Sequence, residues 1–484
     1  MTTLPAPLVD IHTSPHDVPS TPSWFAEVIL LARHFTQRGI LAAVAEHVRL
    51  ARGRAGHYDV IDFVAVLLGY ALSGEPTIEA FFDRLRPFAD PFMALFGRDQ
   101  LPHRSTLSRF LADVEQACLD ALRQQFDHDL CTHGFEGDLL GGLFDRSGHR
   151  LLVFDVDATR QVARQRALVT ASEFPAPRRR MDQVCAPGYR GRKRGEVVRT
   201  RTTVLQAHTQ QWLGTFSGAG NGDYGAELDA ACRGITAYLK PKGFSPAQAL
   251  LRLDALYGNA SPLARIQQAG LGFVTRGRDY QLLDHAKVHA RLEYPCDARV
   301  KHPETQIERD LFDVGYITDW LAPVPDLALT CRLIVARQRA PEHVEAVTNG
   351  KLRDGCVYEL FLTTVPAHCL HATEVVDLYF QRGGFEQVLS DEDAEQDPDR
   401  WCSCTPHGQE FWQIVSHWVW NSRLELGQVA DEAGLRTTRW QGAASVVSAQ
   451  DLPMVEQPLV DPVVEQYGAP EIAGNWGRAS GRFS

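Results

Sequence analysis

The stretch LLVFDVDAT, residues 151–159, decides the fold class of this sequence. It is dominated by apolar and β-branched residues, which predict a buried β-strand. Two further strand-like runs, 202–209 and 212–218, follow it with a tight connection between them. A helical segment at 225–239 then leads to a second buried run, ALLRLDALYG at 249–258. With the short helix and the strand that come next, the order is strand, hairpin, helix, strand, helix, strand, which indicates an α/β fold.

The segments around this α/β core differ from it in character. Before it, apolar residues recur at helical intervals, as in the helix predicted over 58–72, and indicate a helical domain. Such a domain is either a DNA-binding domain with a helix-turn-helix or a plain helical scaffold. After the core, short strand-like pieces separated by loops predict a β-rich insertion. We therefore expect a loose leader (1–22), a helical N-terminal domain (23–145), a core in two parts (146–276 and 369–440), a β-rich insertion (277–368) and a C-terminal extension (441–484). Single helices are expected at 106–118, capped by Ser105, at 374–390 and at 409–427.

The composition is that of an ordinary globular protein. Of the 484 residues, 44% are hydrophobic and 23% are charged. The first residues lack the basic start and apolar run of a signal peptide, and no uninterrupted apolar stretch is long enough to span a membrane. We therefore expect a soluble, cytoplasmic protein without a membrane partner.

The cysteines favour free thiols over a structural site. The ten cysteines follow no regular spacing, as in proteins of a reducing compartment. The close pair Cys402 and Cys404 has His407 nearby but lacks the second pair that a zinc site would need.

One segment of the chain is strongly basic although the whole chain is acidic. The formal net charge is -11 at pH 7, which argues mildly against a nucleic-acid partner. From Arg178 to Arg201, however, arginines and lysines are interrupted by only two acidic residues, Asp182 and Glu196. Such a segment either grips DNA at one place or is a solvated charged loop. The cations that we take as DNA-binding candidates are Arg190, Arg192, Lys193, Arg194, Arg199 and Arg201.

The two buried strands of the core carry carboxylates that are suited to hold a metal ion. Asp155 and Asp157 are two residues apart on the first strand, so they project from the same face. Asp254 lies near the end of the second strand, where ligands and metals collect in α/β sheets. A buried charge needs a counter-charge, so the alternative for each acid is a structural salt bridge, with Arg252 or Arg276 as the partner.

A third set of candidate residues lies on the helix expected at 374–390 and just beyond it. At about 100° per residue, four polar residues share one face within about 60°. They are Tyr379, Arg382, Glu386 and Asp393. Arg382 can bind a phosphate with two hydrogen bonds, Tyr379 can position a backbone oxygen, and Glu386 can complete a cation site. The alternative is an ordinary solvated face, and spacing alone does not separate the two.

This helix resembles a motif of DDE transposases from bacterial insertion sequences, in the group named after insertion sequence four. The motif of that group is Tyr-(2)-Arg-(3)-Glu-(6)-Lys. Here it reads Tyr379-Phe-Gln-Arg382-Gly-Gly-Phe-Glu386, with Asp393 at the place of the lysine.

The aspartates of the strands fit the same resemblance. The Asp-x-Thr motif of the first aspartate corresponds to Asp157-Ala158-Thr159, which selects Asp157 over Asp155, and the second aspartate corresponds to Asp254. The resemblance covers about residues 100 to 430, which is most of the chain. It implies a ribonuclease-H-like core that is interrupted by a β-rich insertion.

The function that the resemblance implies is that of a transposase. Such an enzyme binds the inverted-repeat ends of an insertion sequence and catalyses metal-dependent DNA cleavage and strand transfer. Asp157, Asp254 and Glu386 would be its catalytic residues and would hold two Mg²⁺ ions, with Mn²⁺ able to substitute. Its partners would be the double-stranded DNA of the transposon ends and the target, held by a homodimer.

The resemblance also assigns DNA contacts and leaves one departure. Tyr379 and Arg382 would contact DNA, and Tyr358 is the nearest aromatic that could stack on a flipped base, with an ordinary strand aromatic as the alternative. At Asp393, an aspartate in place of lysine repels a phosphate by about 1 kcal/mol or more at contact distance. Either another residue such as Arg400 supplies that contact, or DNA does not approach, or the copy has decayed. Two alternatives therefore stand beside an active transposase: a decayed inverted-repeat DNA-binding protein, and a metal-dependent nuclease on the same core.

Overall fold

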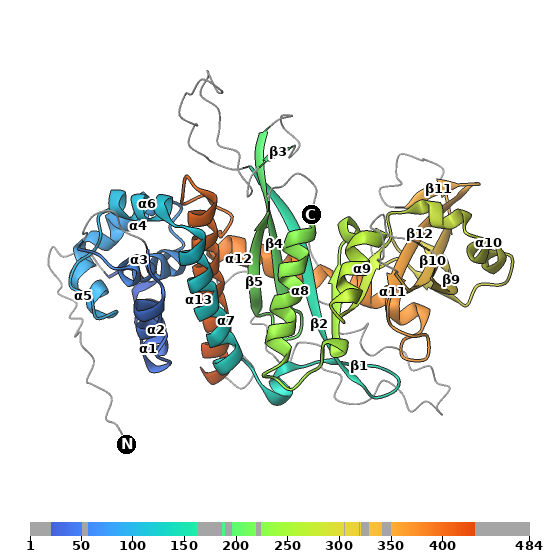
Figure 1. Ribbon diagram of the computed structural model, residues 1–484, viewed down its shortest axis with the longest axis horizontal. Coiled ribbons are helices and arrows are strands. Elements are labelled where there is room, and N and C mark those ends of the chain that lie inside the picture. The colour runs from blue at the N-terminus through green and yellow to red at the C-terminus, as the bar shows by residue number, and fades with distance from the viewer. Residues whose placement is uncertain are drawn as a thin grey trace.

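A computed structural model shows three parts that follow one another along the molecule: helices, a central sheet and a β-rich end (Figure 1). The described residues are 21–50, 57–162, 186–188, 196–218, 224–303, 305–318, 320, 329–340 and 350–430. Nearly all of the expected leader, the whole of the expected C-terminal extension and much of the basic segment lie outside these residues.

A mixed sheet forms the centre of the molecule. Its main strands are β2 (Arg150–Val162), β4 (Glu196–Gln206), β5 (Trp212–Gly218), β6 (Ala249–Leu253) and β7 (Gly272–Arg276), with the short β1 (Leu143–Phe144) beside β2 and β3 (Ala186–Gly188) beside β4. The order across the centre is β5-β4-β2-β6-β7. β5, β4 and β2 pair antiparallel, whereas β2, β6 and β7 pair parallel. The α/β fold expected from LLVFDVDAT is confirmed.

The β-rich region continues this sheet instead of forming one of its own. Its strands are β8 (Ala298–Lys301), β9 (Glu308–Ile317), β10 (Cys331–Arg339), β11 (Lys351–Arg353) and β12 (Cys356–Thr363). β12 pairs antiparallel with β7, and β10, β9 and β8 follow in that order. The helix α10 (Ala286–Leu292) lies at this end, where Arg291 donates to the carbonyl of Asp313 on β9 at 3.2 Å. The region expected at 277–368 therefore widens the core sheet.

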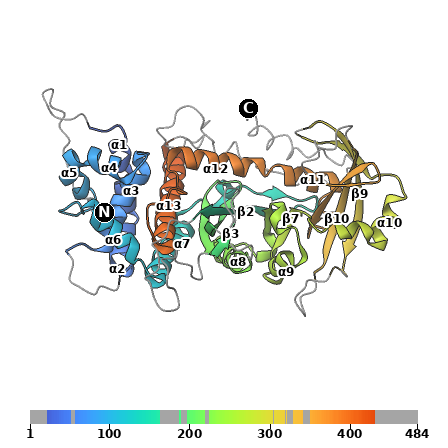
Figure 2. The same cartoon turned by 90° about the horizontal axis from the view of Figure 1, so that it is seen from above.

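Helices cover both faces of the central strands (Figure 2). On one face lie α8 (Gly225–Leu239) and α9 (Ala260–Gln268), and along the other run α11 (Ala372–Phe380) and α12 (Gly383–Glu395). The buried residues of α8 recur at helical spacing, which gives it one apolar stripe toward the sheet. They include Leu228, Ala231, Cys232, Ile235 and Leu239.

The helix expected at 374–390 is two helices with a break between them. At the break, the N–H of Arg382 binds the carbonyl of Tyr379 and the N–H of Gly384 binds that of Gln381, both at 3.1 Å. These three-residue turns replace the four-residue bonds of an α-helix. Two consecutive glycines, Gly383 and Gly384, favour a break here, since glycine is a poor helix former. Tyr379 and Glu386 therefore belong to different helices, a difference from the single face expected.

The helical region packs onto the core through one long helix. Its members are α1 (Phe25–Gln37), α2 (Ile40–His47), α3 (Val60–Ser73), α4 (Ile78–Leu85), α5 (Ala89–Ala94), α6 (Arg104–Asp113) and α7 (Gln116–His133). α13 (Pro406–Ala430), where a helix was expected at 409–427, contacts α3, α6, α7 and also β5. α3 is buried on all sides. The helix expected at 106–118 ends early, at Asp113, and its cap is His103, whose ring accepts the N–H of Ser105 at 3.2 Å.

Among the described helices, no single one is both long and apolar enough to span a membrane. Two bent pairs reach that length and composition only together, Phe25–Gln37 with Ile40–His47 and Val60–Ser73 with Ile78–Ala94.

Candidate active site

The two aspartates of the core strands lie side by side at one edge of the sheet. The parallel ladder between β2 and β6 ends with the pair Val156 and Leu253, so the next residues are Asp157 and Asp254. Neighbouring strands are about 4.8 Å apart, which brings the two side chains close together. Asp254 also caps a short turn, since its Oδ1 accepts the N–H of Leu256 at 2.6 Å.

Asp155 is held in a buried salt bridge. Arg252 donates from two nitrogens to its carboxylate at 2.6 and 2.7 Å, and both side chains are 1% exposed. The other arginine considered as a partner for Asp254, Arg276, lies 3.5 Å from Glu359. The ion pairs of these two arginines are thus with Asp155 and Glu359. The structural alternative therefore applies to Asp155.

Arg382 connects the third acid to the first. Its guanidinium donates to Asp157 Oδ1 at 2.6 Å and to Glu386 Oε1 at 3.1 Å. Arg382 directly precedes α12, and Glu386 lies in the first turn of that helix. The guanidinium lies between the two carboxylates and keeps them apart. The side chain of Glu386 is 60% exposed and that of Asp157 only 16%, so the cluster opens to solvent on the side of Glu386.

Burial and charge set the protonation of this cluster. Burial raises the pKa of Asp254 and the charge of Asp157 raises it further, while Arg382 and Arg278 act in the opposite direction. Burial lowers the pKa of Arg382, but the surrounding carboxylates outweigh that effect and its pKa is raised. Arg382 thus faces the carboxylates of Asp157, Asp254 and Glu386, with Arg278 acting on Asp254 as well. Three carboxylates still outnumber these two guanidinium groups, and such an excess of negative charge suits a divalent cation.

Tyr379 forms an inner wall of the site. It is 7% exposed, and its ring packs edge-on against Phe361 and Phe380. The guanidinium of Arg276 lies 5.9 Å from the ring centroid. Burial raises the pKa of the Tyr379 hydroxyl. These contacts shape the site from inside the protein and do not support the surface contact with DNA that the sequence suggested.

Two of the predicted DNA-binding cations are internal instead. Arg199 and Arg201 are 0% and 2% exposed on β4. Arg201 lies 2.7 Å from Asp399 and 3.6 Å from Glu392, and Arg199 donates to the carbonyl of Pro406 at 2.8 Å. The structure therefore corrects their assignment, because a buried and paired guanidinium is not available to a phosphate. The candidates Arg190, Arg192, Lys193 and Arg194 lie outside the described residues.

Tyr358 is an aromatic of the sheet. It pairs in register with Arg337 on β10 and Lys351 on β11, and its ring is half-buried against the hydrophobic core. The next residue, Glu359, binds Arg309 at 2.7 Å and also Arg276, beside Tyr379 of α11. Because side chains alternate along a strand, Tyr358 points to the opposite face from α11. The structure does not bring it to the carboxylates.

The acidic residues at the end of α12 include two that pair with buried arginines. Glu392 and Glu395 are buried and lie 3.6 Å from Arg201 and 3.0 Å from Arg423. Asp393, at the place of the lysine, is exposed. Glu392 and Glu395 thus anchor this end of the helix in the protein interior, whereas Asp393 lies at the surface.

Arg400, considered as a replacement for the lysine, is engaged within the protein. It lies 2.6 Å from Asp397 and donates to the carbonyl of Glu75 at 2.9 Å and to the hydroxyl of Tyr70 at 3.2 Å. These bonds tie the chain after α12 to the helical region. A phosphate would have to displace them, which makes Arg400 a poor substitute.

Two further residues hold the site in place. Thr275 donates to the backbone carbonyl of Asp254 at 2.9 Å and so fixes the end of β6 against β7. Arg252 donates to the carbonyl of Leu378 at 3.2 Å, so its pair with Asp155 also positions the end of α11. A signal for that pair exists in the sequence: aligning FDVD with LRLD on their last aspartates sets Asp155 opposite Arg252.

Comparison with known proteins shows a distant structural likeness. No family model and no curated protein matches this chain. Among solved structures, a piggyBac transposase in a synaptic complex with hairpin DNA, solved by cryo-EM, is similar to it with a TM-score of 0.39 and 12% sequence identity. The match covers 82% of this chain and 74% of that chain.

Proposed function

We propose that this chain is a DDE-type transposase, which binds the inverted-repeat ends of an insertion sequence, cuts them in a metal-dependent reaction and joins them to target DNA. The observation that supports this function best is the carboxylate cluster. Asp157 and Asp254 follow neighbouring parallel strands, and Arg382 links Asp157 to Glu386 from the start of a helix that crosses the same face. These are three residues of the expected kinds at one place, although they are remote from one another along the chain.

The proposed core is ribonuclease-H-like. Supporting it are the hairpin strands β4 and β5 on one side of β2 and the parallel strands β6 and β7 on the other. The catalytic aspartates of this proposal follow the β2–β6 pairing at its carboxyl end, where α/β sheets carry their sites. The β-rich strands, which join the sheet through β12 and β7, precede the helices that supply Arg382 and Glu386.

The residues of the cluster fit Mg²⁺. Their donors are all carboxylate oxygens, which are hard ligands, and burial together with the charge of Asp157 raises the pKa of Asp254, as expected where carboxylates lie close enough to share a cation. Two such ions, or Mn²⁺ in their place, would activate an attacking oxygen and stabilise a leaving one in phosphoryl transfer. Asp157, Asp254 and Glu386 would hold these ions, with Asp157 proposed to be shared between them.

Arg382 is the proposed phosphate contact beside the acids. A guanidinium binds phosphate oxygens with two parallel hydrogen bonds, and this one sits among the carboxylates that would hold the metal. The basic segment that includes Arg190, Arg192, Lys193 and Arg194 is proposed to hold the flanking DNA backbone. Two transposon ends must be brought together, so we expect a homodimer on DNA.

The test uses the variants Glu386→Gln and Asp254→Asn with duplex DNA from the borders of the gene. Both are expected to lose Mg²⁺-dependent cleavage while keeping DNA affinity within a fewfold of wild type. Asp354→Asn, whose side chain is 87% exposed on a β-turn, is the matched control and should cleave normally. Cleavage that survives in both site variants would overturn the assignment.

The same assay separates the alternatives. Hydrolysed ends without joined products would identify a nuclease on this core. DNA binding without cleavage in Mg²⁺ or Mn²⁺ would identify a binding protein. Short inverted repeats bounded by a target duplication in the flanking DNA would support the transposase.

A further inference from the structure

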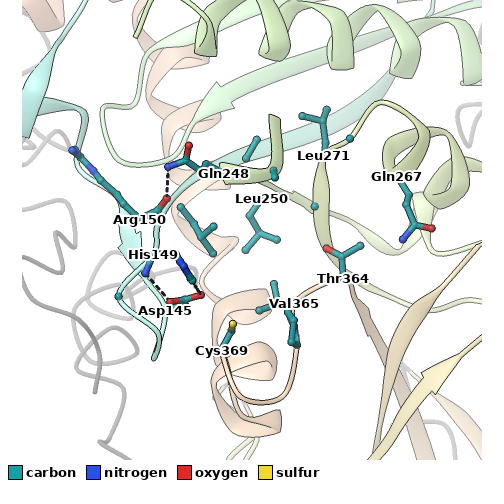
Figure 3. Close-up of a pocket in the computed structure, with 17 residues that line it drawn as sticks. Asp145, His149, Arg150, Gln248, Leu250, Gln267, Leu271, Thr364, Val365 and Cys369 are labelled. Carbon is teal, nitrogen blue, oxygen red and sulfur yellow. Dashed lines mark hydrogen bonds and ion pairs between the residues drawn. The ribbon is translucent and has the colours of Figure 1, made fainter. Parts of the chain in front are cut away.

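A pocket lies at the opposite edge of the sheet from the carboxylate cluster (Figure 3). It has a volume of about 690 Å³ and is lined by the first residues of β2, β6 and β7, among them Arg150, Ala249 and Gly272. Asp157 is seven residues further along β2 than Arg150, and at a rise of about 3.3 Å per residue it lies roughly 20 Å away. This pocket is therefore a separate place on the protein.

Three side chains with metal-binding atoms meet at the rim of this pocket. One ligand atom each from Asp145, His149 and Cys369 lie within 4.8 Å of one another. His149 Nδ1 is 3.2 Å from Asp145 Oδ2, and Figure 3 shows Cys369 beside the same carboxylate. In a tetrahedral zinc site the metal–ligand distances are about 2.0–2.3 Å, which sets the ligand atoms roughly 3.3–3.8 Å apart. The distance between His149 and Asp145 is already close to this range, and the other ligand atoms, which lie within 4.8 Å, need to move closer by about 1 Å at most.

The surrounding contacts hold two of these ligands before any metal arrives. Asp145 Oδ1 accepts the backbone N–H groups of Ser147 and His149 at 2.9 and 2.8 Å, which leaves Oδ2 for the shared site. The N–H of Arg146 binds the carbonyl of Cys369 at 2.9 Å. The turn between β1 and β2 and the loop before α11 are thus already joined beside the cluster. Such supporting bonds orient metal ligands and increase affinity.

We propose that Asp145, His149 and Cys369 bind a zinc ion that ties the turn between β1 and β2 to the loop before α11, with a water from the pocket as the fourth ligand. The combination of thiolate, imidazole and carboxylate is one that zinc accepts, whereas Mg²⁺ prefers oxygen ligands. The site is independent of the proposed DNA chemistry, since it shares none of the three acids. Zinc binding is expected to stabilise the position of α11. This helix is also held by the ion pair of Arg146 with Glu374 at 2.5 Å.

The cluster without metal has another explanation, a hydrogen-bonded turn with a buried thiol. A cysteine binds zinc as its thiolate, whereas the thiol of a hydrogen-bonded turn keeps its proton. Metal binding would therefore release a proton, and a hydrogen-bonded turn would not. This difference gives the proposal a direct readout.

The test measures zinc and cobalt binding by the full chain in the presence of millimolar Mg²⁺, which occupies oxygen sites. One zinc per chain is expected, with Co²⁺ giving a thiolate charge-transfer band and Zn²⁺ raising the melting temperature. His149→Gln and Cys369→Ser should each weaken zinc binding by at least about tenfold, and Cys369→Ser should also abolish the band, because it removes the thiolate. The side chain of His149 is 71% exposed, so the first of these variants is expected to fold normally.

Matched controls separate this site from other thiols, imidazoles and carboxylates. His289→Gln, an exposed histidine on α10, and Cys296→Ser, a half-buried cysteine, should bind zinc as the wild type does. Asp254→Asn should do the same, which keeps this result apart from that of the proposed active site. Equal zinc affinity in wild type and His149→Gln, or a cobalt complex without the thiolate band, would overturn the proposal.

Discussion

The guanidinium of Arg382 donates to the carboxylate of Asp157 at 2.6 Å across the gap between α12 and β2. The same guanidinium reaches Glu386 at 3.1 Å, so it occupies the space in which a cation would be shared by these acids. An arginine cannot lose its charge in a protein. A divalent ion and Arg382 are therefore competitors for Asp157, and bound DNA can resolve that competition by drawing Arg382 to a phosphate.

Removing this competitor should change metal binding and DNA cleavage in opposite directions. In Arg382→Gln we expect Mn²⁺ affinity without DNA to increase by about tenfold, because loss of a positive charge near three carboxylates is worth more than about 1 kcal/mol. Cleavage in the presence of DNA should fall, because the guanidinium that binds the phosphate is gone. Mn²⁺ binding followed by electron paramagnetic resonance and cleavage of border DNA measure the two effects. Unchanged metal affinity would show that Arg382 does not hold the cation site.

Metal binding should also depend on pH through Asp254. Burial and the neighbouring Asp157 raise the pKa of this carboxyl, so it takes up a proton at a higher pH than an ordinary aspartate. A protonated carboxyl is a poor ligand, and metal affinity should therefore fall as the pH drops toward and through that raised pKa. Mn²⁺ titrations between pH 5 and 8 measure this fall. In Asp254→Asn the affinity should be low throughout, and its pH dependence should be weaker than in wild type.

The two aspartates of FDVD should differ sharply in what they do for stability. Asp155→Asn leaves Arg252 buried without its counter-charge, and breaking a buried pair in this way costs about 3–5 kcal/mol. Asp157→Asn removes a partner of Arg382, but Arg382 keeps Glu386 and the repulsion of Asp254 is relieved, so its cost should be clearly smaller than that of Asp155→Asn. Denaturation by urea measures both. Equal losses in the two variants would contradict the division into a structural and a catalytic aspartate.

From the sequence, the strands of the sheet and the positions of the acids could be predicted more completely than the contacts made by the residues around them. Apolar residues at regular intervals indicate which face of a strand or helix is buried. The strands around Asp157 and Asp254 and the helices on each side could therefore be predicted from the sequence. The pair of Asp155 and Arg252 depends on strand register, which the shared pattern of FDVD and LRLD contains but which single-strand reasoning does not use. The break before α12 depends on two glycines within an otherwise helical pattern.

Contacts between distant segments could not be anticipated in this way. Arg199 and Arg201 belong to a basic run in the sequence, yet the ladder between β4 and β2 carries them into the interior under α13. Charge density along a chain does not tell which side chains face inward. The meeting of His149 with Cys369 is of the same kind, since these residues come from turns that are remote in the sequence.

The part of the basic segment outside the described residues carries its own prediction. Replacing Arg190, Arg192, Lys193 and Arg194 with glutamine should weaken binding to border DNA at low salt. The slope of the logarithm of affinity against the logarithm of salt should shrink by about 0.9 for each phosphate that the variant no longer neutralises. The exposed pair Arg84 and Arg86, changed in the same way, is the control and should leave the slope as it is. A slope that the four replacements do not alter would identify a solvated loop.

The last prediction concerns Glu392, which is 0% exposed beneath α13. Burial is the main reason that its pKa is raised from an ordinary 4.5 to about 8, in spite of Arg201 at 3.6 Å. At neutral pH it is therefore largely protonated, and Arg201 relies on Asp399 at 2.7 Å. Burial also lowers the pKa of the neighbouring His417 well below its usual value, so that ring stays neutral.

The sign of the stability effect follows from these protonation states. Between about pH 4.5 and pH 8 the folded protein keeps a proton on Glu392 that the unfolded chain releases. The free energy of unfolding must then fall as the pH rises through this range, by on the order of 5 kcal/mol at most. Glutamine has no proton to lose, so in Glu392→Gln this fall should be smaller, and at pH 8.5 the variant should be more stable than wild type. Urea denaturation at pH 5, 7 and 8.5 measures the difference. If the free energy of unfolding depends on pH in the same way in both proteins, Glu392 is ionised in the folded state, because Arg201 compensates the cost of its burial.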